Sequence, residues 1–487
     1  MHALSPPAKS AIRSPARSDD AVRLMSRVID VLNSRPLRRL SELCLTGLLH
    51  LRRVLPRGPL DRLLRWYLAA DSPCAGLPDT PSRRFVRWFF QHFGEKTMRR
   101  AQAFVNETPA AQAARRLDRF LRLLLVAELR AIARYFAGRC PTPESPLLNQ
   151  AQLALYPHCD LSCHGCYTQE DRQGQPPSRA DVAWMIDEAE SCGAYIIHVV
   201  GKGEPFLSPS WAEGFLDVLA ARPHLFFTVV THGMRITPQQ AARLGRLGNV
   251  LILVSIDGPA ELHDARRGPG SYARVQQALS LLRQHGVFFG FSTTVTAQNH
   301  GELTQPAFID DLVAAGCSVG MYSRYFPLSP AHRDTLQLSP TALSDYQRAF
   351  TTARDQAPIP LLDLDDIEQA TGCHSRFGES VHIDGVSGSV TPCIRVPFAP
   401  ADCRLDRASG RGLSAILAHE FFVDYRRRRG PCPSWCGADL QGELIAVERI
   451  LDTHGGASPR LADYRERSPA PAEPVRLRLP IVSSSPR

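Results

Sequence analysis

The sequence predicts an α/β protein with an open, partial (βα)6 barrel of the TIM type at its centre, a helical extension before it and a small Cys-rich domain after it. Three patterns indicate this. Apolar residues in the first third recur at three- and four-residue steps, short apolar runs alternate with amphipathic segments from residue 151, and Cys, Gly and turn residues gather after residue 360. The composition, with 44% hydrophobic and 22% charged residues among 487, excludes collagen, coiled-coil rods and wholesale disorder.

The first third of the chain is strongly basic. Residues 1–20 lack the apolar core of a secretory signal, and we expect a disordered lead, although their Ser and Arg content faintly resembles a transit peptide. Residues 21–146 are predicted to form an Arg-rich helical extension that ends in a Pro-rich joint. Residues 1–150 hold 26 Lys and Arg against 12 Asp and Glu. The extension is therefore either an ordinary solvated helical domain or, through residues 21–140, a surface for a membrane or another anionic partner.

Residues 147–358 carry the alternating pattern of the barrel. The predicted strands are 151–156, 195–201, 225–231, 250–257, 287–296 and 318–326. The predicted helices are 179–191, 209–221, 237–246, 271–285, 300–315 and 341–356, with Ser271 as a candidate N-cap. Six strand–helix units in series favour a parallel sheet with outer helices, although a doubly wound sheet has the same periodicity. None of the apolar runs is long enough to span a membrane.

Three cysteines follow the first predicted strand with the spacing C-x3-C-x2-C. They are Cys159, Cys163 and Cys166, and Tyr167 comes directly after them. Three thiolates on one loop can hold a compact metal centre, and soft sulfur ligands select zinc or iron–sulfur clusters. A zinc site would need a fourth ligand, for which His164 is poorly placed, whereas three ligands leave one iron of a cubane open.

This loop and its position resemble the cluster motif of the radical S-adenosylmethionine (SAM) superfamily. The resemblance implies that the three cysteines bind a 4Fe–4S cluster whose open iron chelates SAM, and that Tyr167 shields the cluster. It also implies reductive cleavage of SAM to a 5′-deoxyadenosyl radical, which abstracts hydrogen from a substrate. The three cysteines are accordingly the expected catalytic residues, and the expected fold is the superfamily's partial barrel.

Later segments resemble the SAM-binding elements of the same superfamily. Gly201-Lys202-Gly203-Glu204-Pro205 is similar to the GGEP motif that contacts the SAM amino group, with Lys202 in place of a glycine. Ser255 and Asp257 end the fourth strand, like polar residues that serve the ribose and methionine of SAM. Arg266 or Arg267 is the implied partner of the SAM carboxylate, and guanidinium geometry suits that contact.

Two further strand ends carry weaker signals. The third strand ends in Thr231-His232-Gly233, which resembles the usual TNG turn with His232 in place of Asn. The fifth strand carries Thr293, whose hydroxyl either faces SAM in the barrel or simply reflects the preference of Thr for strands.

Residues 359–455 resemble a truncated SPASM or twitch domain, and residues 456–487 are predicted to be a flexible tail. Cys373 and Cys393 flank Gly388 in the C-x14-G-x4-C pattern that opens such domains, and residues 382–393 are predicted to form a hairpin that presents Cys393. Cys432 and Cys436 complete the implied ligand set of one auxiliary iron–sulfur cluster, with Cys403 as a substitute. The alternative is buried structural thiols plus a zinc site.

The resemblance implies a cytoplasmic radical SAM enzyme that receives electrons from a donor such as a flavodoxin or ferredoxin. The basic residues 21–140 suggest a peripheral membrane location as the alternative. Peptide or protein modification is the favoured reaction, since many relatives with such C-terminal domains mature peptides. A lipid or membrane-borne substrate is the first alternative, and a non-catalytic iron–sulfur or zinc protein is the second. No nucleic-acid-binding module is recognisable, so no nucleic-acid partner is expected.

Overall fold

The computed structural model describes residues 142–168, 172–325, 333–396 and 398–427, together with residues 81, 84, 85, 88 and 92. The predictions for residues 1–20, for most of 21–141, for Cys432 and Cys436 and for the tail 456–487 lie outside the described residues. Within the described part of the chain, no helix combines the length and the hydropathy needed to cross a membrane.

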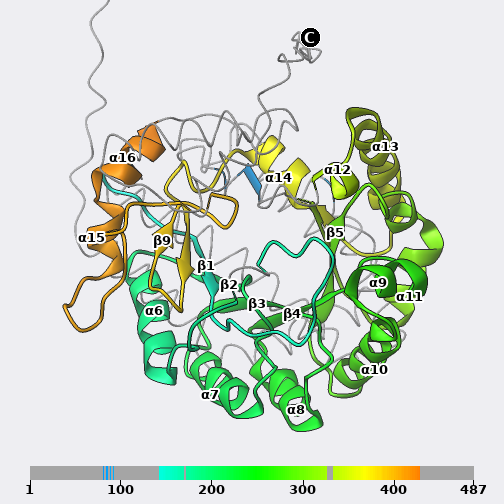
Figure 1. Cartoon of the computed structure of the whole chain (residues 1–487), viewed down its shortest axis with the longest axis horizontal. Coiled ribbons are helices and arrows are strands. Elements are labelled where there is room, and N and C mark those ends of the chain that lie inside the picture. Colours follow the sequence, from blue (N-terminus) through cyan, green and yellow to red (C-terminus); the bar gives the residue numbers. More distant parts are fainter. Residues whose placement is uncertain are drawn as a thin grey trace, which may run out of the picture.

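All six predicted strand–helix units are present, with the helices outside the sheet (Figure 1). The strands are β1 (Gln150–Ala154), β2 (Ile196–Val199), β3 (Phe226–Thr231), β4 (Val250–Ser255), β5 (Phe289–Val295) and β6 (Gly320–Arg324). The helices are α6 (Arg179–Ser191), α7 (Pro209–Ala220), α8 (Pro238–Leu247), α9 (Ala260–Arg267), α10 (Ser271–Gln284), η2 (Glu302–Thr304), α11 (Pro306–Ala314), α12 (Arg333–Leu336) and α13 (Pro340–Gln356).

Several of these helices begin after a Ser or Thr residue that caps the first turn. Ser178, Ser208, Thr237 and Ser339 each accept a hydrogen bond from a first-turn amide of the helix that follows. The prediction that Ser271 caps its helix is wrong. Gly270 is the N-cap residue of α10, and the Asp264 carboxylate accepts from the amides of Gly270 and Tyr272 and from the Ser271 hydroxyl. A carboxylate from the preceding helix therefore does the capping.

Three more strands extend the sheet beyond the six predicted units. They belong to the last described segment, which forms β7 (Leu361–Asp363), α14 (Leu364–Thr371), β8 (Ser380–Asp384), β9 (Val390–Thr391), α15 (Leu413–Leu417) and α16 (Glu420–Arg427). β8 pairs in parallel with β1, from Gln150 opposite Ser380 to Ala154 opposite Asp384, and β9 pairs antiparallel with β8 as the predicted hairpin. The edge of β1 needs partners for its backbone groups, and β8 supplies them.

The strand order is β7-β6-β5-β4-β3-β2-β1-β8-β9, which is sequential through the first seven strands. A doubly wound sheet would reverse direction within that series, so the order supports the partial barrel. Apolar side chains between the sheet and the outer helices form the main core. α14 packs against β6, and its Leu364, Ile367 and Glu368 line the inside of the barrel.

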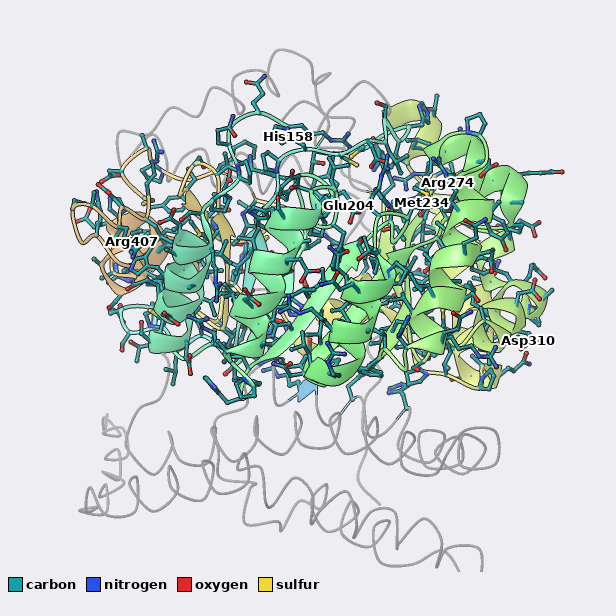
Figure 2. All side chains as sticks on the ribbon, turned by 90° about the horizontal axis from the view of Figure 1, so that it is seen from below. His158, Glu204, Met234, Arg274, Asp310 and Arg407 are labelled. Carbon is teal, nitrogen blue, oxygen red and sulfur yellow. The ribbon has the colours of Figure 1, made fainter. Side chains whose placement is uncertain are left out.

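The two ends of the barrel carry different elements. His158 and Glu204 lie at the end where the parallel strands finish, and the short blue ribbon of the described N-terminal residues lies at the opposite end (Figure 2). There, Arg84 Nη1 donates to the carbonyl of Thr371 at 3.3 Å and lies over the ring of Phe377. Described residues of the N-terminal extension thus cover the end of the barrel where the strands begin.

Candidate functional site

A cavity of about 630 Å³ runs along the inside of the barrel. Its walls include Cys159, Cys163 and Cys166 from the loop after β1, and Cys373 and Cys393 from the segment around β8 and β9. The two sets of cysteines that the sequence analysis singled out therefore open onto one common space. The volume is in the range of small-molecule and cofactor sites.

The cysteine loop is held by contacts within the first two barrel units. The Thr168 hydroxyl lies 3.3 Å from Cys166 Sγ, and Arg172 Nη2 donates to the same sulfur at 3.2 Å. Burial opposes ionisation of Cys166, but the Thr168 hydrogen bonds and the Arg172 charge outweigh it and lower the pKa of the thiol. Burial dominates at Cys163 and raises the pKa of that thiol.

The turn after β2 is tied directly to the cysteine loop. The amide of Gly203 donates to the carbonyl of Tyr156 at 2.6 Å, and the amide of Glu204 donates to that of His158 at 2.8 Å. A Cβ atom at Gly203 would lie 2.1 Å from the His158 carbonyl oxygen. Only glycine permits this approach, which explains the second glycine of the motif.

Lys202 occupies an unusual backbone position in the same turn. Its φ is 57°, in the left-handed region, and no other non-glycine residue with positive φ occurs in the described part of the chain. Its ammonium reaches past β1 to Asp384 at the end of β8, with Nζ 2.9 Å from Oδ2, and its carbonyl accepts from the Thr168 hydroxyl. Lys202 therefore links the cysteine loop to β8.

Glu204 is buried and accepts three hydrogen bonds from the protein. Its side chain is 2% exposed and accepts hydrogen bonds from the Thr231 hydroxyl and from the amides of Phe206 and His232. These donors hold the carboxylate at the edge of the cavity beside the cysteine loop. Pro205 is buried next to it and is not among the residues that line the cavity.

Asp257 is fully buried and binds both arginines that were candidates for a SAM contact. Arg267 Nε donates to its Oδ2 at 2.6 Å, Arg266 Nη1 donates to the same oxygen, and the Thr294 amide donates to Oδ1 at 2.9 Å. Burial opposes the charge of Asp257, but the two guanidinium groups outweigh it and hold the pKa of this carboxyl well below its usual range. Arg266 and Arg267 also line the cavity, so they are cations on its wall fixed from behind by one carboxylate.

The remaining predicted contacts lie around the same space. Tyr167, Ser255 and Thr293 line the cavity, and Thr293 Oγ1 is buried without a hydrogen-bond partner. An unpaired buried hydroxyl costs free energy, so an acceptor or donor at this position on a bound molecule would be stabilising.

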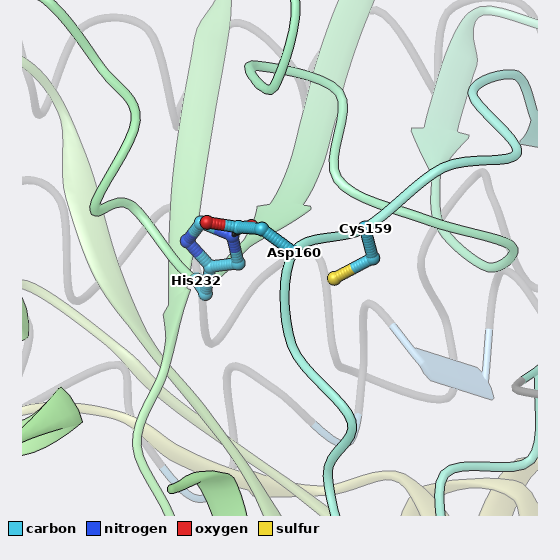
Figure 3. Close-up of side chains that lie close together, drawn as sticks. All are labelled: Cys159, Asp160 and His232. Atoms are coloured by element: carbon cyan, nitrogen blue, oxygen red, sulfur yellow. Dashed lines mark hydrogen bonds and ion pairs between the residues drawn. The ribbon is translucent and has the colours of Figure 1, made fainter. Parts of the chain in front are cut away.

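Sequence reasoning missed the role of Asp160. Asp160, His232 and Cys159 lie together (Figure 3), and Asp160 Oδ1 is 2.9 Å from His232 Nε2. Asp160 also accepts from Arg235, while His232 Nδ1 accepts from the amide of Met234 at 3.1 Å. Both ring nitrogens are thus engaged within the protein, which favours a role in positioning the cysteine loop over metal ligation. The two residues lie 72 positions apart, and no local pattern connects them.

Of the described cysteines in the segment after the barrel, two line the cavity and one does not. Cys373 is buried and Cys393 half-buried, and both line the cavity. Cys403 is buried elsewhere, beside Asp402 and His419, and burial raises the pKa of its thiol to about 12. Cys403 does not line the cavity, so the structure gives no support to it as a substitute ligand there.

The residues present fit an iron–sulfur cluster and SAM. Three thiols from one loop open onto a space that also holds a buried carboxylate, two fixed guanidinium groups and an unpaired hydroxyl. Soft sulfur ligands suit iron, and the acidic and basic groups suit the amino and carboxylate groups of an amino acid.

Comparisons with known proteins agree with this geometry. The sequence model described as the Radical SAM superfamily matches residues 153–305. The chain is 33% identical over 191 residues to mycofactocin maturase MftC of Mycobacterium ulcerans (strain Agy99), covering 38% of this chain and 49% of the relative. It is 33% identical over 145 residues to the AdoMet-dependent heme synthase of Oleidesulfovibrio alaskensis, covering 29% and 37%. The chain thus spans less than half the length of these curated relatives.

A solved structure shares the fold. Streptococcus suis SuiB bound to precursor peptide SuiA superposes with a TM-score of 0.52 at 13% identity, covering 66% of this chain and 77% of SuiB. SuiB shares the fold of this chain, and the match of residues 153–305 to the superfamily model supports the expectation of an enzyme of this class. Residues 153–305 of this chain form a domain of the radical SAM superfamily.

Proposed function

We propose that the chain is a radical SAM enzyme in which Cys159, Cys163 and Cys166 hold a 4Fe–4S cluster. The observation that carries the proposal is the single cavity onto which these thiols open together with Glu204, Arg266 and Arg267. When bound, the cluster and SAM would supply an electron and a 5′-deoxyadenosyl radical that takes hydrogen from a substrate.

The chain's own residues would bind and orient the two groups. Thr168 and Arg172 hold Cys166 by hydrogen bonds to its sulfur. The amides of Gly203 and Glu204 donate to carbonyls of the segment after β1, which holds the turn after β2 against the cluster site. Glu204 would accept from the SAM amino group, and Arg266 or Arg267 would face the carboxylate. Ser255 and Thr293 would meet the remaining polar atoms, while Tyr167 covers the cluster.

The favoured substrate is a peptide or protein. The match to curated maturases supports this class, and SuiB, which shares the fold, is described bound to a precursor peptide. The heme synthases match at similar identity over a shorter stretch, so similarity of the barrel alone does not select the substrate. A flavodoxin or ferredoxin would provide the electron.

We further propose one auxiliary iron–sulfur cluster in the segment after the barrel. Cys373 and Cys393 line the same cavity as the first three cysteines, which supports a second cluster near the substrate. Cys432 and Cys436 would complete its ligands. In this division of the chain, residues 21–146 form the extension, 147–358 the core and 359–455 the cluster domain.

The test is anaerobic reconstitution with iron and sulfide, followed by dithionite and SAM. We expect 5′-deoxyadenosine from the wild type and from a Cys317→Ala control, in which a buried thiol away from the cavity is removed. Cys163→Ala should form none. Equal 5′-deoxyadenosine from Cys163→Ala and the wild type would overturn the enzyme proposal.

Two alternatives have separate readouts. A lipid substrate, suggested by the basic first third, predicts flotation with anionic liposomes at low salt. A non-catalytic zinc protein predicts zinc and no iron after anaerobic purification. Iron without zinc would exclude the zinc protein, and absence of liposome binding would count against the lipid substrate. The peptide-modifying enzyme would then be the remaining candidate.

A further inference from the structure

The inner wall of the barrel carries its own apolar cluster, separate from the main core. Phe226, Leu251, Leu253, Phe288 and Val319 form this lumenal cluster. All five line the cavity, and four of them keep 8–9% of their surface accessible. Residues facing the outer helices are mostly less exposed, as Phe227 and Ile252 at 0% illustrate. The lumenal cluster therefore faces a space that the described residues do not fill.

The lumenal cluster lies toward the end of the barrel where the strands begin. Phe226 is the first residue of β3, Leu251 is the second residue of β4, and Phe288 and Val319 immediately precede β5 and β6. Phe85 from the N-terminal extension also lines the cavity. The cysteine loop and Glu204 lie at the other end, so the cluster is a deeper compartment beneath the proposed SAM site.

Several charged side chains of the cavity lie at the SAM end, where they are paired. Lys202 binds Asp384, Arg324 binds Asp366, and Arg395 binds Asp365 at 2.8 Å. The cavity wall also carries Glu368 and His374, and His374 Nδ1 lies 3.1 Å from Glu379 Oε2. The five members of the lumenal cluster itself are all apolar.

Polar side chains on β1, β2 and β3 lie beside the lumenal cluster and bind one another. His198 Nε2 lies 2.8 Å from Gln150 Oε1, and Nδ1 lies 2.7 Å from the Thr228 hydroxyl. Burial lowers the pKa of His198 to about 4, so the ring is neutral near pH 7. The Ser318 and Ser380 hydroxyls, which also line the cavity, have no hydrogen-bond partner in the described structure. They offer a polar contact at the far end and no charge.

Apolar walls around unfilled space lose contacts that a ligand would restore, and apolar cavities bind apolar molecules for this reason. We propose that the lumenal cluster binds an uncharged apolar group of the substrate and so points the neighbouring carbon toward the SAM end. This inference rests on the proposed function. The proposed function favours a peptide substrate, so we assign this group to the apolar side chain of a peptide residue; a hydrocarbon chain is the competing outcome of the test.

The test measures binding to the reconstituted protein with a neutral apolar fluorophore, N-phenyl-1-naphthylamine. Met321 also lines the cavity and packs on the lumenal cluster, so Met321→Trp should fill the compartment and weaken binding at least about tenfold. Val313→Trp, against the outer core on α11, is the matched control and should bind as the wild type does. Val230→Phe, another lumenal substitution, serves if Met321→Trp does not fold.

Competition identifies the source of the apolar group. Displacement by 1-decanol indicates a hydrocarbon chain, and displacement by N-acetyl-leucinamide indicates a peptide side chain. Displacement of the fluorophore by SAM, equal binding to both lumenal variants and the wild type, or no binding at all would overturn the proposal. The 5′-deoxyadenosine assay is a separate measurement. If the fluorophore does not bind but the enzyme still forms 5′-deoxyadenosine, the proposal for the lumenal cluster is wrong and the proposed function is unaffected.

Discussion

Lys202 and Asp384 form a buried ion pair that joins the turn after β2 to the end of β8, with Nζ 2.9 Å from Oδ2. The two side chains are 7% and 17% exposed. The pair lies across β1, whose loop carries the three cysteines, because β2 and β8 flank β1 in the sheet. Lys202 adopts positive φ where the superfamily motif has glycine, so its side chain provides a contact that glycine could not make.

We expect Lys202→Met to lower the free energy of unfolding by about 3 kcal/mol, because it leaves the Asp384 carboxylate buried without its cation. Lys202→Met combined with Asp384→Asn should recover much of that loss. Urea unfolding of the single and the double variant measures these changes in the free energy of unfolding, with Arg179→Met as a control. Arg179 and Asp217 form an exposed pair, for which we expect less than about 1 kcal/mol.

The same pair predicts a pH dependence. Burial opposes the charge of Asp384, but the Lys202 ammonium outweighs it and lowers the pKa of the carboxyl below its usual 3.8. A group whose pKa is lowered by folding stabilises the native state above its unfolded pKa. The stability advantage of wild type over Asp384→Asn should therefore be complete at neutral pH and disappear as the pH falls below 3.8. An advantage that grows on acidification would contradict the pairing.

Gly203→Ala should disrupt the contact between the turn and the cysteine loop. The new Cβ would meet the His158 carbonyl oxygen at 2.1 Å, and backbone cannot move aside as a flexible side chain can. We expect less iron per chain after anaerobic reconstitution and a lower melting temperature. Gly301→Ala is the control, since nothing lies within 4 Å of its added Cβ and its φ of −68° suits alanine. Full iron content in Gly203→Ala would show that the close approach is dispensable.

Asp257→Asn should be among the most destabilising single changes in the barrel. It removes the carboxylate that two buried guanidinium groups share, and we expect a loss of about 3–5 kcal/mol in chemical unfolding. Asp264→Asn removes the α9 carboxylate that caps the start of α10 and should cost only about 1 kcal/mol. Similar losses of unfolding free energy for Asp257→Asn and Asp264→Asn would mean that the carboxylate shared by the two arginines is not a major source of stability.

The auxiliary cluster predicts a stepwise iron count. Wild type should bind about twice the iron of Cys373→Ala combined with Cys393→Ala, while both retain the SAM-cleaving cluster. Cys403→Ala should keep the full amount, because Cys403 lies away from the cavity. Iron analysis with electron paramagnetic resonance of the reduced proteins separates the two clusters. An unchanged iron count in the double variant would exclude Cys373 and Cys393 as ligands.

Much of the fold was predictable from the sequence because its signals are local. Apolar alternation located the six strands to within a few residues, Ser and Thr caps marked several helix starts, and the spacing of Cys159, Cys163 and Cys166 indicated a cluster loop. The hairpin of β8 and β9 followed from turn residues between two short strands. Each signal depends on neighbouring positions, which the linear chain already places together.

Only the tertiary structure decided which distant residues meet. It paired β8 with β1, gave Lys202 its partner in Asp384, and shared Asp257 between Arg266 and Arg267. It also brought Asp160 to His232 and left a space beside the lumenal cluster. Long-range contacts depend on how the curved, open sheet brings strands together, and no periodicity encodes that. The sequence by itself therefore indicated the class of chemistry, and the curvature of the sheet decided which side chains meet around the cavity.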